Sequence, residues 1–483
     1  MSYENERNMK LFLFQWPVDT NAYIEALSAL ETAGHKIAYF VYSGNPDAAK
    51  KRLPRAIFHE HERALDGEPA KETTEFVIPP DASLVKKMAE TESIVLSMMN
   101  KHFDYMSIDE RKQVYYNMLG YWYAVLLRFK PDALIFPAPP HSVYDYLTYT
   151  LAHALGIRTI LFDCTIIGDR YIWMTDFRKG SEAICHALKH LECECITPQD
   201  LSEEMRGYYE RSRSSSDPYI PPYVAEDKKK YSYMNVLLLR GRLVLRSIAE
   251  RSFLKKTFLF VLKVFGENIH KEYRCVSRVP DLSEPFVYVP LNYQPECTTS
   301  PQGDIFVVQT LMLETLSAAL PAGWRLYVKE HPGQWGPRGL NFSSSRYKGY
   351  YRRIAHIRGV TLVPVDTKSS VLIARSRAVA TVSGTAGFEA ILRQKPAIIF
   401  GHPWYQNAPA LLRADSVESC RHCFEKIMNG FEICEVENCR FLRALETETI
   451  HAHFQEYTKR HSSVTSDESV RATVKVILEM LRT

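Results

Sequence analysis

Two stretches of the chain decide its fold: RLYVKEHP at residues 325–332 and VSGTAGFEA at residues 382–390. In each, an apolar run of strand length stops at small, polar or basic residues, and a helical pattern follows the second run. A strand that leads into a helix is the repeating unit of an open parallel sheet, and such sheets bind ligands at the carboxyl ends of their strands. The two stretches therefore predict an α/β domain with a binding site along one edge of its sheet.

The second junction has the composition of a phosphate site. Its hydroxyls and unhindered backbone N–H groups come from Ser383, Gly384, Thr385 and Gly387. Such groups at the start of a helix bind anions. Lys329 and His331 end the earlier strand and add positive charge or hydrogen-bond donors nearby. We therefore expect a phosphate-bearing donor between the two junctions.

Four more residues complete the predicted donor site. They are Gln294, Glu296, Pro332 and Glu389. Glu389 is expected to contact a hydroxyl of a nucleotide sugar or to brace the turn; alternatively, it is an acid that favours the helix dipole. Gln294 and Glu296 stand in a polar loop that follows another predicted strand.

Several strings resemble the capsule-polysaccharide synthesis family, which includes transferases of the acidic sugar Kdo. They are VPLNYQPE at 289–296, VKEHP at 328–332, SGTAGFEA at 383–390 and KPAIIFGHPWY at 395–405. The resemblance covers about residues 286–405. It implies a GT-B fold, in which two Rossmann-like domains face a cleft. It also implies a CMP-activated donor of Kdo or a related nonulosonic acid, with the histidine of the His-Pro motif near the CMP phosphate.

The length and composition predict a globular protein of several domains. A chain of 483 residues favours two or three domains, and 46% hydrophobic and 24% charged residues are ordinary values. The net charge of +4 gives no signal for nucleic-acid binding. We expect a cytoplasmic location for three reasons. The start of the chain is polar, no apolar run approaches ~20 residues, and the cysteines are scattered.

The order of predicted elements divides the chain into four parts. We expect an N-terminal Rossmann-like acceptor domain at residues 1–227, basic linker helices at 228–283, a C-terminal donor domain at 284–465 and a final helix at 466–483. The alternation of strands and helices implies right-handed parallel crossovers in each sheet. The GT-B resemblance implies that the final helix crosses back to the first domain.

The segment from Lys228 to Lys263 carries ten basic residues against Glu250 alone, with apolar residues interleaved. This basic amphipathic pattern is typical of a helix that lies on an anionic membrane surface. Alternatively, the segment is an interdomain helix with a solvated basic face, or a groove for an anionic acceptor. If it contacts lipid, the protein is peripheral at the inner face of the cytoplasmic membrane.

The first domain offers five candidates for acid–base chemistry. His141 and Asp145 stand four residues apart near the start of a helix and share one face of it. Asp19 lies in the break after the first strand, and we rank these three first. Alternatively, His141 and Asp19 are caps, and Asp145 is an acid that favours the helix dipole. Asp163 and Asp169, which follow a later strand, are second choices.

No standard motif for a metal or cofactor is present. The chain has no P-loop, no G-x-G-x-x-G, no H-E-x-x-H and no D-x-D pair, so we expect CMP-sugar as co-substrate, no cofactor and no metal. Four cysteines are close in sequence: Cys420, Cys423, Cys434 and Cys439. They could bind zinc, but ordinary reduced thiols are the simpler interpretation. A basic, aromatic run at residues 338–353 is interpreted as a solvated helix face.

These features favour a glycosyltransferase that moves an acidic sugar from a CMP-linked donor to a glycan or lipid-linked acceptor. A non-catalytic sugar-nucleotide or glycan-binding partner in a surface-assembly complex would keep the phosphate site but lack an acid–base residue. An epimerase or a glycerophosphotransferase on the same fold is a third alternative. The Kdo-transferase resemblance implies retention of the anomer but assigns no nucleophile here.

Overall fold

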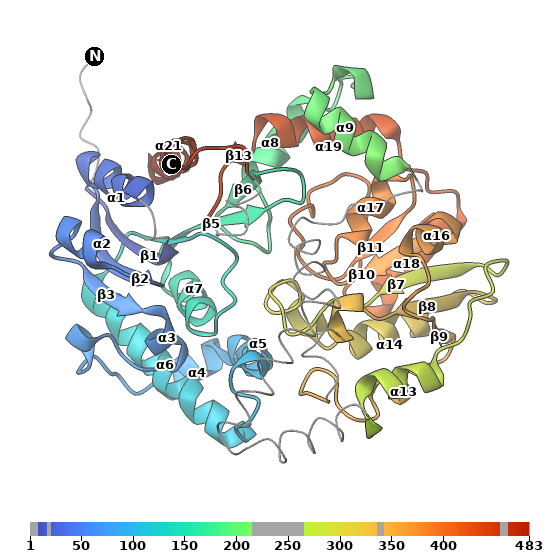
Figure 1. Cartoon of the computed structure of the whole chain (residues 1–483), viewed down its shortest axis with the longest axis horizontal. Coiled ribbons are helices and arrows are strands. Elements are labelled where there is room, and N and C mark those ends of the chain that lie inside the picture. The colour runs from blue at the N-terminus through green and yellow to red at the C-terminus, as the bar shows by residue number, and fades with distance from the viewer. Residues whose placement is uncertain (1–7, 17–20, 215–264, 336–341, 455–461, 483) are drawn as a thin grey trace, which may run out of the picture.

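The computed structural model describes residues 8–16, 21–214, 265–335, 342–454 and 462–482. Two sheets, each covered by helices, lie side by side in this structure (Figure 1). Their strands are apolar runs that are buried on both faces, as parallel strands between layers of helices usually are. Asp19 and the segment 228–263 lie outside the described residues.

The first sheet has seven strands in the order β13-β6-β5-β4-β1-β2-β3. Their bounds are β1 Lys10–Trp16, β2 Lys36–Tyr42, β3 Ile57–Glu60, β4 Ala133–Phe136, β5 Arg158–Cys164, β6 Arg170–Met174 and β13 Ile450–His451. The strands β1 to β5 are parallel, whereas β6 and β13 pair antiparallel. The order reverses between β1 and β4, which makes this the switch point of the sheet.

The helices of the first domain include α1 Asn21–Thr32, α2 Asp47–Arg52, α3 His61–Leu65, α4 Ala82–Lys87, α5 Ala89–Met98, α6 Ile108–Phe129, α7 Tyr144–Leu155, α8 Glu182–His190 and α9 Glu203–Arg213. The longest of them, α6, begins at a capping box in which Ser107 and Glu110 bond each other's backbone N–H groups. The polar stretch between residues 51 and 82 contains β3 and α3.

The second sheet has six parallel strands in the order β12-β11-β10-β7-β8-β9. They are β7 Phe286–Pro290, β8 Arg325–Lys329, β9 Val360–Leu362, β10 Ala378–Thr381, β11 Ala397–Ile399 and β12 Leu411–Arg413. The helices are α13 Ile269–Val276, α14 Gln309–Ala319, α15 Tyr350–Ala355, α16 Ser369–Arg375, α17 Ala386–Leu392, α18 Val417–Met428 and α19 Glu435–Thr447. This is the strand order of dinucleotide-binding domains. The predicted GT-B fold of two Rossmann-like domains is confirmed.

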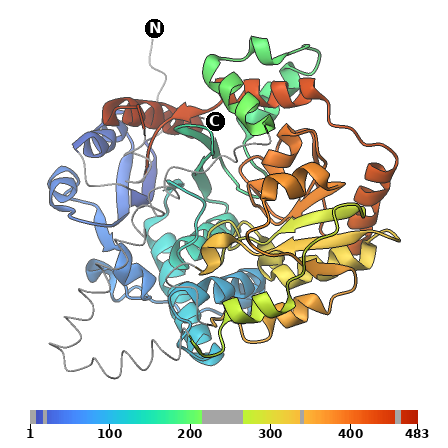
Figure 2. The same ribbon diagram turned by 45° about the vertical axis from the view of Figure 1, so that its right-hand side comes forward.

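The end of the chain packs on the first domain (Figures 1 and 2). The final helix α21, Ser466–Arg482, places Val474 and Ile477 in one hydrophobic cluster with Leu11 of β1 and Leu30 of α1. The predicted second domain extended to residue 465, whereas β13 already pairs with β6 of the first sheet.

The two domains contact each other through polar loops as well as a shared hydrophobic cluster. Arg178 of the first domain lies 3.5 Å from Asp304 of the second. Gln406 donates a hydrogen bond of 2.6 Å to the carbonyl of Phe177, and Asn407 accepts one of 3.0 Å from the N–H of Ser181. These loops hold the two sheets in the arrangement seen in Figure 2.

None of the helices in the described ranges is both long enough and apolar enough to span a membrane.

Candidate functional site

The switch point of the second sheet, between β7 and β10, is held by three polar side chains. Asn292 donates to the Ser383 hydroxyl at 3.4 Å and accepts from the Thr381 hydroxyl at 3.3 Å. Ser383 in turn donates to the carbonyl of Thr298. The hydroxyl of Ser383 is therefore already bonded to the loop that follows β7.

At the turn into α17, the side chain of Tyr405 lies close to the backbone. A side chain at Gly387 would place its Cβ 2.5 Å from the Tyr405 hydroxyl, so only glycine fits there. That hydroxyl donates to the carbonyl of Gly384. Thr385 is exposed at the start of α17, and its side chain makes no capping bond. Because α17 has seven residues, its dipole alone is a weak anion site, and neighbouring cations must contribute.

Lys329 is a buried cation whose charge acts on Glu389 of α17. It ends β8, and its Nζ donates to the carbonyl of Thr367 at 2.9 Å and to the Ser369 hydroxyl at 2.5 Å. Burial lowers the pKa of Lys329 to about 8, while the negative charges of Glu389 and Asp366 oppose that shift. Lys329 therefore carries its proton at neutral pH and loses it under mildly alkaline conditions.

Glu389 faces Lys329 from α17. Burial raises the pKa of its carboxyl, against the positive charges of Arg393 and Lys329. The structure thus brings together Lys329 and Glu389, which come from the two stretches that decided the fold.

His331 lies beside this pair. Its Nδ1 accepts a hydrogen bond of 3.1 Å from the N–H of Gly333, so the neutral ring carries its proton on Nε2. The residue as a whole is exposed, but its ring lies 5.7 Å from that of Tyr293. Desolvation of the ring lowers the pKa of His331, and the charge of Lys329 acts in the same direction. A neutral imidazole with Nε2–H is a hydrogen-bond donor that suits a phosphate oxygen. Pro332, also exposed, begins the short helix that follows.

Beneath His331 lies a buried ion pair that the sequence did not reveal. Glu330 and Arg346 are both fully buried and bonded twice, at 2.6 and 3.1 Å. Tyr351 donates to the same carboxylate at 2.6 Å. The interpretation of residues 338–353 as a solvated face is therefore wrong for Arg346 and Tyr351, because a buried carboxylate requires them as partners.

The two residues predicted from the loop after β7 differ in their surroundings. Gln294 is buried, and its side chain donates to the Val307 carbonyl and accepts from Gln309 and Arg346. Glu296 is exposed. The side chain of Gln294 is thus occupied by protein partners, whereas that of Glu296 is exposed and accepts only the N–H of Cys297, at 3.0 Å, among the described residues.

In the first domain, Asp145 lies at the switch point between β1 and β4. Its Oδ1 accepts hydrogen bonds of 2.6 Å from the N–H groups of Ser142 and Tyr146, and its Oδ2 accepts one of 2.8 Å from Gln15. His141 bonds the carbonyl of Pro139 through Nδ1 at 2.8 Å. Both residues therefore brace the turn after β4.

Asp163 differs from Asp145 in its partners and in its pKa. It lies near the end of β5 and accepts a 3.0 Å hydrogen bond from Gln302 of the second domain. Burial raises the pKa of Asp163 to about 7, against hydrogen bonds from Gln302 and the N–H of Cys164 that lower it. It is thus a carboxyl at the domain interface that titrates near neutral pH, a property typical of acid–base residues. Asp169 lies beyond it, where its carbonyl accepts from Ala452.

His61 is a candidate that the sequence analysis missed. It follows β3, and its Nδ1 lies 2.7 Å from the hydroxyl of the buried Tyr144. Burial lowers its pKa, and Asp145 and His141 are close enough to act on it electrostatically. No short motif marks His61, because β3 itself was not recognised.

The four cysteines do not converge. Cys420 and Cys423 lie in the hydrophobic cluster under α18, whereas Cys439 lies in the cluster shared by the two domains. Burial raises the pKa of Cys420 to about 12 and that of Cys423 to about 11. Within the described ranges, no group of three or more histidine, cysteine or acidic side chains is arranged to hold a metal.

Comparisons with solved structures give distant likenesses. UDP-GlcNAc 2-epimerase from Methanocaldococcus jannaschii is 13% identical, with 98% of this chain and 100% of that chain covered and a TM-score of 0.24. The beta Kdo 2,7 transferase KpsC of Thermosulfurimonas dismutans is 11% identical over 77% of this chain and 91% of that one, at 0.29. The beta Kdo 2,4 transferase KpsC of that organism is 12% identical over 71% and 87%, at 0.32. TM-scores this low carry no inference.

No curated protein matches the chain. A family match is found within the second domain: residues 300–420 fit the family described as capsule polysaccharide biosynthesis protein. These residues contain Lys329, His331, Ser383 and Glu389. The predicted resemblance to the capsule polysaccharide synthesis family is therefore confirmed, over residues 300–420 of this chain.

Proposed function

We propose that the protein is a glycosyltransferase that moves an acidic sugar, Kdo or a related nonulosonic acid, from a CMP-activated donor to a surface-glycan or lipid-linked acceptor. One observation carries the proposal. The capsule-family region contains Lys329, whose charge acts on both His331 and Glu389, and Gln302 of that region bonds Asp163 of the other domain. The residues proposed to bind phosphate thus belong to the domain that also reaches the titrating carboxyl of Asp163.

The donor phosphate is assigned to Lys329, His331 and Thr385. Lys329 supplies charge, the Nε2–H of His331 and the hydroxyl of Thr385 supply donors, and Glu389 takes a hydroxyl of the nucleotide sugar. Because Ser383 already bonds Thr298, we assign it to shaping the turn through its hydroxyl and to binding through its backbone. Lys329 and His331 would then offset the charge that develops on the departing CMP.

The reacting carboxylate is assigned to Asp163. In a single displacement, the acceptor hydroxyl attacks the anomeric carbon, the bond to CMP breaks and Asp163 takes the hydroxyl's proton. In a double displacement, Asp163 itself attacks the anomeric carbon as the bond to CMP breaks. The acceptor hydroxyl then displaces the carboxylate, which takes the hydroxyl's proton, and the two inversions retain the anomer. Both routes need ionised Asp163, and the anomer of the product distinguishes them. Asp145 and His141, which were ranked first from sequence, are assigned to holding the turn instead.

A donor panel tests the function. The protein is incubated with CMP-Kdo, a CMP-nonulosonic acid, UDP-sugars and CDP-glycerol together with glycan acceptors, and released nucleotide is measured. We expect CMP release from an acidic-sugar donor alone. Release of UDP or CDP-glycerol products in its place would contradict the proposal and favour an epimerase or glycerophosphotransferase.

Calorimetry with CMP tests the donor site. His331→Ala should weaken CMP binding by about tenfold or more, because a hydrogen bond to a charged group is worth ~1.5–3 kcal/mol. His356→Ala, an exposed histidine at the C-terminal end of α15, is the matched control and should bind CMP like the parent. Parental binding by both His331→Ala and Thr385→Ala would remove the assignment.

The segment 228–263, outside the described residues, is proposed to bring the protein to anionic lipid at the inner face of the cytoplasmic membrane. Each basic residue near such a surface is worth about 1 kcal/mol, and salt weakens the attraction. Sedimentation with anionic vesicles should therefore recover more protein than with neutral vesicles, and less as salt rises. Equal recovery with both vesicles would contradict this part of the proposal.

A further inference from the structure

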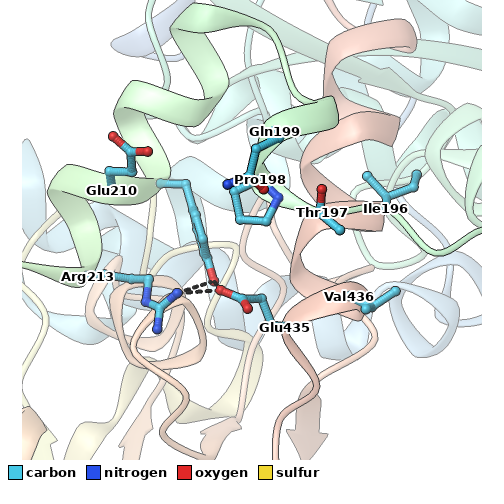
Figure 3. A pocket seen from close by; sticks show the side chains of 9 residues that line it. Ile196, Thr197, Pro198, Gln199, Glu210, Arg213, Glu435 and Val436 are labelled. Carbon is cyan, nitrogen blue, oxygen red and sulfur yellow. Dashed lines mark hydrogen bonds and ion pairs between the residues drawn. The ribbon is translucent and has the colours of Figure 1, made fainter.

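A cavity of about 410 Å³ lies away from the donor residues, between α9 of the first domain and α19, which leads from the second domain back to the first (Figure 3). In Figure 1 these two helices lie next to each other at the top of the view, beside α8. None of the residues assigned to transfer lines this cavity. It is large enough for one or two sugar rings.

The wall of the cavity is built around one ion pair. Arg213 of α9 and Glu435 of α19 are paired, and the hydroxyl of the buried Tyr209 donates to the same glutamate oxygen at 2.8 Å. The guanidinium of Arg213 lies 5.4 Å from the Tyr209 ring centre. The pair is thus fixed in place by an aromatic ring, although its members remain 42% and 40% exposed.

The same groups keep hydrogen-bonding capacity toward the cavity. Among the residues that the structure describes, Glu435 Oε2 and the Nη2 of Arg213 have no bonded partner, and neither has the Gln199 amide. Figure 3 shows Arg213 and Glu435 on one side of the cavity and the turn of Pro198 and Gln199 on another. Planar donors and acceptors fixed in this way are what the hydroxyls of a sugar ring require.

The remaining lining is mixed, with Thr197 and Glu210 among apolar residues. Ile196, Pro198 and Val436 contribute surfaces of the kind against which the C–H face of a sugar packs. Glu210 also lines the cavity, so one arginine stands against two glutamates and leaves one negative charge in excess. This charge disfavours phosphates and acidic sugars, so a neutral saccharide suits the lining better than an acidic one.

We propose that this cavity binds a neutral saccharide unit of a glycan, at a site separate from the one where transfer takes place. Its ligand would contact α9 and α19 together, so binding would also brace the junction between the domains. The inference does not depend on the proposed transfer, because it concerns a different surface and is measured by binding.

Saturation-transfer NMR on the full chain tests the inference, with maltose, lactose, cellobiose and chitobiose as neutral probes and N-acetylneuraminic acid as the acidic one. We expect at least one neutral disaccharide to bind and the acidic sugar to bind at least tenfold more weakly. Saturating CMP should leave this binding unchanged. Absence of binding by all four disaccharides, or displacement of the bound one by CMP, would overturn the inference.

Variants locate the site. Glu435→Gln and Gln199→Ala should each weaken the disaccharide at least fivefold, and Gln199 is exposed, so its replacement leaves the fold intact. Glu437→Gln, on the same helix but outside the cavity, is the matched control and should bind like the parent. Parental binding by both Glu435→Gln and Gln199→Ala would place the sugar elsewhere and overturn the proposal.

Discussion

The two domains gather polar side chains at the same place in their sheets, and in both the side chains at the switch point are bound to one another. Between β1 and β4, Asp145 is bonded to Gln15 and to the backbone. Between β7 and β10, Asn292 joins Ser383 and Thr381. The groups with shifted pKa values lie one strand further out: Asp163 on β5, next to β4, and Lys329 on β8, next to β7. In each sheet, the side chains at the switch point therefore hold the carboxyl-end edge in place, and the neighbouring strand carries the titrating group.

The largest effect is expected from Asp163→Asn. If Asp163 is the reacting carboxylate, transfer should fall by about 10²–10⁴-fold while CMP binding stays parental. In the parent, transfer should rise with pH through about 7, because the ionised form of Asp163 reacts. Initial rates from pH 5.5 to 8.5 measure both. Parental rates in Asp163→Asn would rule out Asp163 and leave Asp145 and Asp19 as the aspartates of the first choice.

The same variant should also change how the melting temperature depends on pH. Because the folded-state pKa of Asp163 is raised from 3.8 to about 7, its contribution to stability is complete below pH 3.8 and is lost as pH rises through 7. Asp163→Asn should therefore raise Tm at pH 8 relative to the parent and change it less at pH 5. A group that costs stability and is needed for transfer is what a functional site predicts. A lower Tm at pH 8 would contradict the buried, ionised carboxylate.

A large loss of stability is expected in the second domain from Arg346→Met. It leaves Glu330 buried without its partner, which should cost about 3–5 kcal/mol of unfolding free energy. Calorimetric Tm measures the loss. Arg352→Met is the matched control, because Arg352 is 58% exposed in its pair with Glu267 and should change Tm little. Equal Tm values for the two variants would show that Glu330 is not buried as described.

A smaller effect concerns the charge of Lys329. Its pKa of about 8 means that CMP binding should weaken by about tenfold or more between pH 7 and 9.5, as a charge-assisted contact worth ~1.5–3 kcal/mol is lost. Lys329→Arg keeps the charge, so its affinity for CMP should stay level over that range. Calorimetry at the two pH values distinguishes them. A level response in the parent would rule out Lys329 as a phosphate contact.

The smallest effect is expected from Asp145→Asn. The amide keeps one oxygen for the two backbone N–H groups but loses the charge that Gln15 bonds, so stability should fall by about 1.5 kcal/mol. Transfer should fall less than tenfold and CMP binding should not change. If transfer instead falls as far as in Asp163→Asn, Asp145 at the switch point takes part in the reaction. The conclusion that the reacting group lies on the neighbouring strand is then wrong.

The sequence predicted the second sheet well because its strands are apolar runs that end at small, polar or basic residues, as at Lys329 and Ser383. It ranked Asp145 above Asp163 because residue spacing shows which side chains share a helix face, but not which carboxyl has its pKa raised by its surroundings. The Gln302 that reaches Asp163 comes from the other domain, and the Arg346 that meets Glu330 comes from a distant loop. Both partners depend on tertiary contacts that no local pattern encodes.

The return of the C-terminal helix has a consequence for synthesis on the ribosome. Leu11, Leu13 and Ile37 share their hydrophobic cluster with Ile477 and Leu481 of α21. These early apolar side chains leave the ribosome long before α21, and the entire second domain is made in between. The second domain can therefore finish folding while the first still exposes an apolar face, which is a state prone to aggregation and a substrate for chaperones. A nascent chain stalled just before α21 would carry a completed second domain on an unfinished first one.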